Sequence, residues 1–258
     1  MSLPKPYYED EYVTLYHEDC RDILPLLAGV QLIVTSPPYN KMGLGAAKRA
    51  KISSSDNVAW KKCLIHYGDF DDDMPEPEYQ EWQRTIVELL YDVLAQGGSL
   101  FYNHKHRIRL HRVITPLQWL TQTRFELVQE IVWDRGSTPA IKPVRFYPTT
   151  ERIYWLTKGT AAPVFNADYA RFMEVWRVSA QTSTPHPAPM PLEIASRCVG
   201  ACSSPSDVVL DPYAGGGTTL VAAKALGRKA IGIELDEQWC ALSAQRLSQN
   251  VLDFGGVA

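Results

Sequence analysis

The sequence predicts an α/β protein built on a doubly wound, mostly parallel sheet. Apolar strand segments alternate with helical segments along most of the chain, which is the pattern of βαβ units. The run QLIVT (31–35) is continuously apolar, as expected for a strand covered on both faces. A glycine-rich turn joins an apolar strand to a helix near residue 215, as in nucleotide-binding folds. The length of 258 residues suits one such domain, so we expect residues 1–258 to form a single unit.

The individual elements follow from hydrophobic spacing and from the residues that break it. Strands are expected at 13–17, 31–35, 98–103, 125–133, 152–158, 207–211 and 229–235. Helices are expected at 21–27, 76–96, 107–120 (interrupted near Pro116), 191–202, 218–226 and 236–247, with Gly97 and Gly98 ending the second one. Residues 41–72 are polar, basic and weakly periodic, which predicts a long mobile loop of the kind that often serves function.

Composition excludes several classes of protein. The chain is 45% hydrophobic and 21% charged, which is typical of a globular domain, and it lacks the run of about 18 apolar residues that a membrane span needs. Its N-terminus has no apolar signal core, so we expect a cytoplasmic location. The five cysteines include no CxxC pair, which argues against a zinc site or a disulfide framework. We expect no metal, and we interpret Cys198 and Cys202 as small buried residues on a helix.

The net charge of −3 does not by itself favour nucleic acid, but the positive charge is segregated. One basic group contains Lys41, Lys48, Arg49 and Lys51, and a second lies in NHKHRIRLHR (103–112). Each group is open to two interpretations, a solvated face or a surface that contacts phosphates.

The glycine turn carries the most specific chemistry in the chain. Asp211 ends a strand, Gly215, Gly216 and Gly217 follow, and Glu234 ends the next strand, where an acid can bind ribose hydroxyls. The phosphate-loop pattern is absent and the GxGxxG pattern is broken at Leu220, which disfavours a nicotinamide-dependent oxidoreductase. An acid before the loop would repel a pyrophosphate and suits a cationic cofactor such as S-adenosylmethionine.

Four segments together resemble one family. DPYAGGGTT…GRKAIGIELD is similar to the cofactor motif of DNA amino-methyltransferases, and TSPPYN (35–40) resembles their catalytic motif. HPAPMPLEIASRCV (186–199) resembles the segment before the cofactor loop, and DCRDILPLL resembles the acidic segment before the catalytic strand. The order, with the catalytic motif first, is that of the β class. The resemblance covers nearly the whole chain apart from 41–72 and 159–182.

The resemblance implies a catalytic role for Ser36, Pro37, Pro38 and Tyr39. The Ser36 hydroxyl and the Pro37 carbonyl would accept hydrogen bonds from an exocyclic amino group, which localises the nitrogen lone pair. The paired prolines hold the carbonyl in place because each ring fixes φ near −65°. Tyr39 would stack on a base flipped out of the duplex.

The same resemblance assigns cofactor contacts, with some alternatives open. Asp19 would lie near the adenine, or it caps the helix that begins near 21. His186 would reach the cofactor carboxylate, or it is structural. The family often has a serine where this chain has Gly216, so the hydroxyl of Thr218 or of Thr219 would take the place of the serine hydroxyl. The remaining expected contacts are Asp211, Tyr213, Gly215, Gly217, Thr218, Thr219 and Glu234.

The expected activity is site-specific DNA methylation, with N4 of cytosine favoured by Ser36 and N6 of adenine as the alternative. Double-stranded DNA would be held by residues 41–72 and by a small recognition region within 137–182, including Lys142 and Arg145. A monomer and a homodimer both fit the sequence, and a cognate restriction endonuclease is a natural partner. An RNA or protein amide methyltransferase and a catalytically silent nucleic-acid module are the competing classes.

Overall fold

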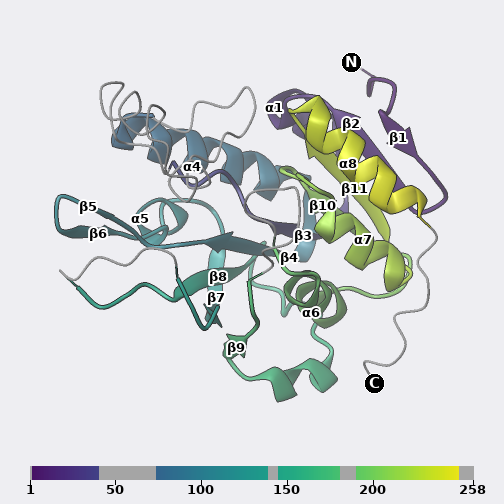
Figure 1. Ribbon diagram of the computed structural model, residues 1–258. Helices are drawn as coiled ribbons and strands as arrows, with labels where there is room; N and C mark the ends of the chain where they lie inside the picture. Colours follow the sequence, from purple (N-terminus) through teal and green to yellow (C-terminus); the bar gives the residue numbers. More distant parts are fainter. Residues whose placement is uncertain (1, 41–73, 139–144, 181–189, 250–258) are drawn as a thin grey trace.

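The computed structural model describes residues 2–40, 74–138, 145–180 and 190–249, and all structural statements concern these ranges (Figure 1). The expected basic loop 41–72 therefore lies outside the described residues. No helix in the described part of the chain combines the length and the apolar character that crossing a membrane requires.

A nine-stranded sheet forms the centre of the molecule, in the order β1-β2-β11-β10-β3-β4-β8-β7-β9. In chain order the strands are β1 (Tyr8–Glu9), β2 (Val13–His17), β3 (Val30–Thr35), β4 (Leu94–His104), β7 (Glu126–Asp134), β8 (Thr150–Thr157), β9 (Val175–Arg177), β10 (Val208–Asp211) and β11 (Lys229–Glu234). The neighbours from β2 through β11, β10 and β3 to β4 are all parallel, and β8 is antiparallel to both β4 and β7. The predicted fold class is confirmed.

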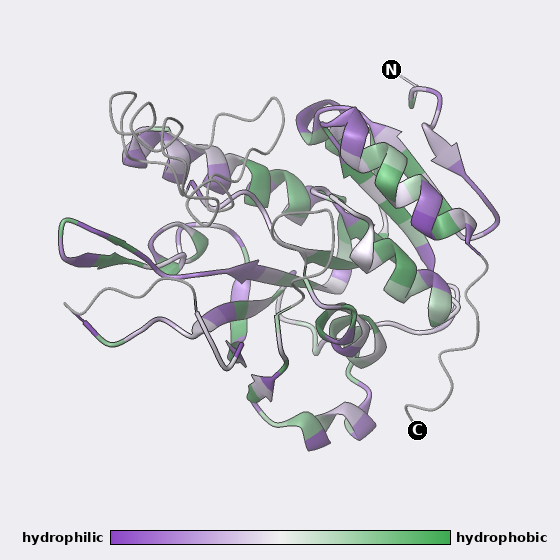
Figure 2. Cartoon of the chain, viewed as in Figure 1, coloured by the Kyte–Doolittle hydropathy of each residue, from purple (hydrophilic) through white to green (hydrophobic). Residues whose placement is uncertain are grey.

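Helices cover both faces of this sheet (Figure 1). They are α1 (Cys20–Ile23), α4 (Glu76–Val93), α5 (Leu117–Leu120), α6 (Leu192–Cys202), α7 (Thr218–Ala225) and α8 (Glu237–Ser248), with the 3-10 turns η1 (Leu24–Leu26) and η2 (Ala167–Phe172). Two core clusters result, one beneath α6 and α7 and the other beneath α4 and α5. Hydrophilic and hydrophobic residues alternate along α4 and α8, the pattern of helices with one buried face (Figure 2).

The central strand β3 has three consecutive apolar residues, from Leu32 to Val34, because both of its faces are covered. Leu32 and Val34 belong to the core on the α6 side, and Ile33 belongs to the core on the α4 side. All three side chains are at most 1% exposed. Because successive side chains of a strand point to opposite faces, a strand covered on both faces has apolar residues at its central positions.

The helix expected at 107–120 is wrong. Residues 107–114 form a separate hairpin, β5 (Arg107–Arg109) and β6 (Arg112–Ile114), and only Leu117–Leu120 are helical. The alternation of arginine with Ile108 and Val113 has a period of two, and Leu110 and His111 turn the chain with positive φ. The helix expected at 76–96 ends at Val93, because Leu94 is already extended and begins β4.

The range 137–182, expected to recognise DNA, contributes two strands to the main sheet. β8 lies between β4 and β7, and β9 pairs with β7. η2 is tied to α6 by a hydrogen bond from the Asn166 N–H to the Ala201 carbonyl. Of its two named basic residues, Lys142 lies outside the described residues, whereas Arg145 is exposed beside the fully exposed Phe146.

Gly232 on β11 sets how closely α7 approaches the sheet. A Cβ atom there would lie 2.6 Å from a Leu220 methyl carbon, 3.0 Å from one of Leu15 and 3.2 Å from the Ala214 Cβ. We expect Gly232→Ala to lower the free energy of unfolding by about 1–3 kcal/mol, because overpacking displaces α7 and the loop before it. Urea unfolding measures this, with Ile231→Val on the same strand as the control, and equal stability of Gly232→Ala and the wild-type protein would contradict it.

Candidate active site at the carboxyl ends of the central strands

The residues predicted to act together meet at the carboxyl ends of the central strands. Ser36 follows β3, Asp211 ends β10 and Glu234 ends β11. In open parallel sheets this edge is where ligands bind, since the loops leaving neighbouring strands form a crevice there. The sheet order therefore brings the catalytic motif beside the cofactor motif, although Thr35 and Asp211 are 176 residues apart in sequence.

The hydroxyl groups of Ser36 and Tyr39 share a small polar cluster. Their oxygen atoms lie 2.8 Å apart, and both contact the Oδ1 atom of Asn103, at 3.2 Å and 2.9 Å. The Tyr39 hydroxyl also lies 3.1 Å from the Glu151 carboxylate, which forms an ion pair with Arg135 at 3.0 Å. Tyr39 is only 5% exposed, so the cluster fixes the ring in place.

Sequence reasoning missed both Asn103 and Glu151. Asn103 lies in the last two residues of β4, so the rule that polar side chains at carboxyl strand ends form sites could have identified it. Glu151 lies near the start of β8, which is antiparallel to β4. Only the register of that pair places Glu151 at this edge, and no local sequence pattern reveals a register.

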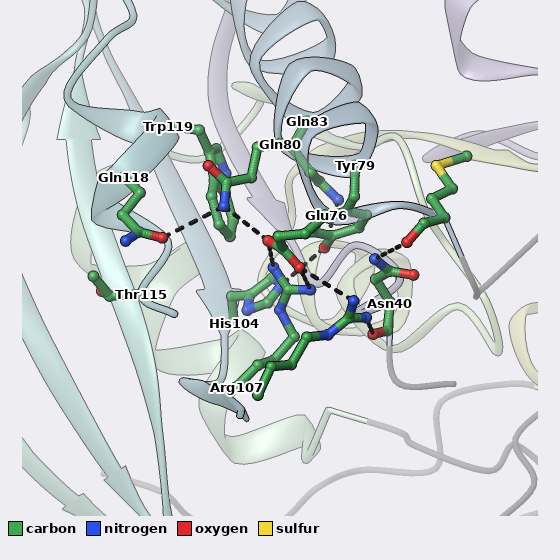
Figure 3. A network of polar contacts seen from close by, with 12 residues as sticks. Asn40, Glu76, Tyr79, Gln80, Gln83, His104, Arg107, Thr115, Gln118 and Trp119 are labelled. Carbon is green, nitrogen blue, oxygen red and sulfur yellow. Dashed lines mark hydrogen bonds and ion pairs between the residues drawn. The ribbon is translucent and has the colours of Figure 1, made fainter. Parts of the chain in front are cut away.

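The two proline carbonyls of the catalytic motif differ in their surroundings. The Pro38 carbonyl accepts hydrogen bonds from the Tyr79 hydroxyl at 2.6 Å and from the Gln83 amide at 3.4 Å. No residue that the structure describes donates a hydrogen bond to the Pro37 carbonyl. Tyr79 also contacts His104 at 2.8 Å, and this buried network beneath the motif comes from α4 and β4 (Figure 3). Within the described ranges the motif is thus held through Pro38, and the Pro37 carbonyl has no hydrogen-bond donor.

Asp211 connects the cofactor loop to the catalytic strand. Its Oδ1 atom accepts hydrogen bonds from the Thr35 hydroxyl at 2.9 Å and from the Tyr213 N–H at 3.1 Å. The side chain is 4% exposed, and burial raises the pKa of this carboxyl to about 6. A positive charge bound nearby would favour the ionised form, so Asp211 fits a cationic cofactor.

Glu234, at the end of the neighbouring strand β11, binds the backbone of the glycine loop. Its two oxygen atoms accept hydrogen bonds from the Gly215 N–H at 2.7 Å and from the Asp236 N–H at 3.0 Å. Burial raises the pKa of Glu234, and the nearby Asp211 contributes in the same direction. Each carboxylate oxygen keeps a further lone pair, which is what binding a ribose diol would use.

The remaining loop residues are held by packing. Gly217 has φ of +75°, and a Cβ atom there would lie 2.2 Å from the Ser243 hydroxyl of α8, so only glycine fits. The buried Thr218 hydroxyl accepts a hydrogen bond from Arg246 at 3.3 Å, and Thr219 contacts the Val34 carbonyl at 3.4 Å. Gly215 also has positive φ, and the Tyr213 ring lies 6.0 Å from Trp82.

The other predicted contacts have mixed placements. Asp19 is the N-cap of α1, since its carboxylate accepts a hydrogen bond from the Arg21 N–H at 2.8 Å. Of the two roles expected for Asp19, a cofactor contact and a helix cap, the structure shows the helix cap. His186, Lys41, Lys48, Arg49, Lys51 and Lys142 lie outside the described residues.

The raised pKa of Asp211 predicts a pH-dependent cost in stability. The folded protein prefers the protonated carboxyl, so the cost is absent below pH 4 and is reached in full as the pH rises through about 6. We expect Asp211→Asn to raise the free energy of unfolding at pH 8 by on the order of 1–3 kcal/mol, a gain that disappears near pH 4.

Urea unfolding of the cofactor-free protein at several pH values measures this effect. Asp168→Asn is the control, because it removes an exposed carboxylate on η2 far from the loop. A gain that is constant with pH would show that burial of the Asp211 charge is not its cause.

Comparison with known proteins identifies the family. The DNA methylase model of the N6/N4 methyltransferases matches residues 30–245. The Type II methyltransferase M.ScaI of Streptomyces caespitosus is 26% identical over 283 residues, which cover 95% of this chain and 84% of that protein.

Two solved structures share the fold. PvuII DNA methyltransferase, described as cytosine-N4-specific, has a TM-score of 0.74 at 18% identity and covers 96% of this chain and 91% of its own. The putative DNA modification methylase TTHA0409 from Thermus thermophilus, solved with S-adenosyl-L-methionine, has a TM-score of 0.66 at 24% identity and covers 93% of this chain and 95% of its own. The chain therefore belongs to the N6/N4 DNA methylase family, whose cofactor is S-adenosylmethionine.

Proposed function

We propose that this chain transfers the methyl group of S-adenosylmethionine to the exocyclic amino group of a base flipped out of duplex DNA, with N4 of cytosine as the target. The observation that carries the proposal is the hydrogen bond from Thr35 to Asp211. It places the residue before Ser36 against the acid of the cofactor loop, so the acceptor and donor of the methyl group would meet at one strand edge. The bound cofactor would supply an electrophilic methyl group on a positively charged sulfur.

The chain's own task is to orient the amino nitrogen. The Ser36 hydroxyl can accept a hydrogen bond from the amine only if its own proton points elsewhere, and the Asn103 Oδ1 atom at 3.2 Å is placed to accept that proton. The Pro37 carbonyl would accept the second amine proton. Two such acceptors favour a tetrahedral nitrogen whose lone pair is aligned with the methyl carbon.

Tyr39 would hold the base against the motif. Its ring centroid lies 4.5 Å from that of His104, and its hydroxyl is bound by Asn103 and Glu151. A ring held beside His104 and through its hydroxyl has a fixed orientation, which is what stacking on a base needs.

The preference for cytosine rests on two supports. Ser36 stands where adenine-specific members of the family often have a carboxylate, and PvuII DNA methyltransferase, with a related fold, is described as cytosine-N4-specific. The relatives described as Type II methyltransferases, such as M.ScaI, further support a role in modifying a specific DNA site.

The base is tested directly by nucleoside mass spectrometry of unmodified DNA incubated with the protein and S-adenosylmethionine. We expect N4-methylcytosine, because Ser36 stands where adenine-specific members of the family often have a carboxylate. N6-methyladenine would keep the chemistry and correct the base. Methylation confined to RNA or protein in parallel incubations would contradict the proposal.

The roles of Ser36 and Asn103 predict a specific pattern of mutant kinetics. Ser36→Ala and Asn103→Leu should each lower kcat by about 10²–10³, because each removes one preorganised hydrogen-bonding group. The double variant should be little worse than either single variant, since both changes disable the same acceptor.

Steady-state methylation assays measure kcat, and calorimetry should find nearly unchanged cofactor affinity in all three variants. Asn166→Ala, which removes a cap of η2 at the far edge of the sheet, is the matched control. Additive losses in the double variant would show that Asn103 does not act through Ser36.

A further inference from the structure

The β5–β6 hairpin exposes an apolar residue at an unusual turn. Leu110 and His111 join the two strands with φ of +48° and +62°, values that such two-residue turns normally fill with asparagine or glycine. A bulky side chain costs free energy in that region, yet Leu110 occupies it and is 93% exposed. A side chain so exposed contributes little to folding.

The base of the hairpin is fixed to the active site. Arg107, only 5% exposed, forms two hydrogen bonds with the Glu76 carboxylate, at 2.8 Å and 2.7 Å, and its guanidinium lies 4.4 Å from the Tyr79 ring centroid. Arg109 donates a hydrogen bond to the Asn40 carbonyl at 3.0 Å, directly after Tyr39. The tip therefore has a defined position relative to the catalytic motif and projects from the body of the molecule (Figure 1).

The hairpin also carries two arginines whose positive charges an anion would stabilise. Arg109 and Arg112 are directly opposite each other across the two strands, and like charges in that arrangement repel. Arg112 is exposed and forms no ion pair with any residue in the described ranges. The sequence from 103 to 125 contains no acidic residue.

The opposite face of the same ribbon is apolar. Ile108 and Val113 form a cross-strand pair and are 37% and 56% exposed, and Leu110 extends this face at the tip. Arginines beside an exposed apolar tip are suited to binding duplex DNA. The phosphates would bind the guanidinium groups, and the apolar side chain would insert between two base pairs that have separated.

We propose that the β5–β6 hairpin is a DNA wedge: it enters a groove of the duplex, inserts Leu110 into the base stack beside the flipped base, and binds phosphate through Arg112. A two-stranded ribbon has the width that the major groove admits. The inference rests on the proposed DNA methyltransferase function. Flipping a base costs unstacking free energy, and an apolar side chain that fills the vacated stack lowers that cost.

Duplex binding is the first test, using fluorescence anisotropy with a fluorescein-labelled duplex of mixed sequence. Leu110→Gly removes the wedge but suits the positive φ, so the fold is not weakened by it. We expect its affinity to fall by about tenfold or more. Met173→Gly is the matched control, since Met173 also has positive φ (+54°) and is 81% exposed, but it lies after η2. Equal affinity of Leu110→Gly and the wild-type protein would overturn the proposal.

Arg112→Gln tests the phosphate contact separately. Its plot of log affinity against log salt concentration should be shallower by about one unit than that of the wild-type protein. An unchanged slope would overturn the phosphate contact.

Methylation kinetics then separate a wedge from a simple docking contact. On a duplex that the wild-type protein methylates, Leu110→Gly should lower kcat/KM by about tenfold or more, and pairing the target base with a mismatch should restore most of that loss because flipping is then cheaper. An equal loss on both substrates would overturn the wedge.

The outcomes also distinguish this inference from the proposed function. DNA methylation by the wild-type protein with an unaffected Leu110→Gly variant would remove the wedge and keep the function. Weakened duplex binding by Leu110→Gly without any methylated base would keep the hairpin as a DNA-binding element and remove the function. A change confined to self-association, seen by sedimentation, would make the hairpin a protein contact and overturn the proposal.

Discussion

The hydrogen bond between Thr35 and Asp211 is the contact on which the site depends. It joins the last residue of β3 to the last residue of β10, at the point where the catalytic and cofactor motifs leave the sheet. Both side chains are buried, so the bond is shielded from water and holds a fixed geometry. A shift of either strand would separate the two motifs.

This arrangement buries two carboxyl groups, and burial makes their ionised forms unfavourable in the cofactor-free protein. Burial raises the pKa of Asp211 and of Glu234, which lies on the adjacent strand. Two buried acids lower the stability of the folded protein. They suit a cationic ligand with a ribose, because its positive charge and its hydroxyl groups would interact with the two carboxylates. The site therefore trades some stability of the free protein for affinity.

The sequence predicted the parts of the fold whose signals are local. The strand 31–35, the glycine turn and the helix at 218–226 were all predicted, because apolar runs, glycines and helical spacing act over short distances. The hairpin at 107–114 was missed because Leu110, Val113 and Leu117 have helical spacing, and because the two residues of its turn do not predict a turn. Glu151 was missed because its place depends on the β4–β8 register.

Helix α4 unites the catalytic turn with the hairpin. Tyr79 binds the Pro38 carbonyl from below, and Glu76, one helical turn earlier, binds Arg107 and lies 3.7 Å from Arg109. Residues three apart share a helix face, so one rigid element fixes both structures. A base acted on at Ser36 and a duplex contacted by the hairpin would then be held at a constant separation. Direct displacement tolerates little misalignment between nitrogen and methyl carbon, so an anchor common to both contacts is the feature that such chemistry needs.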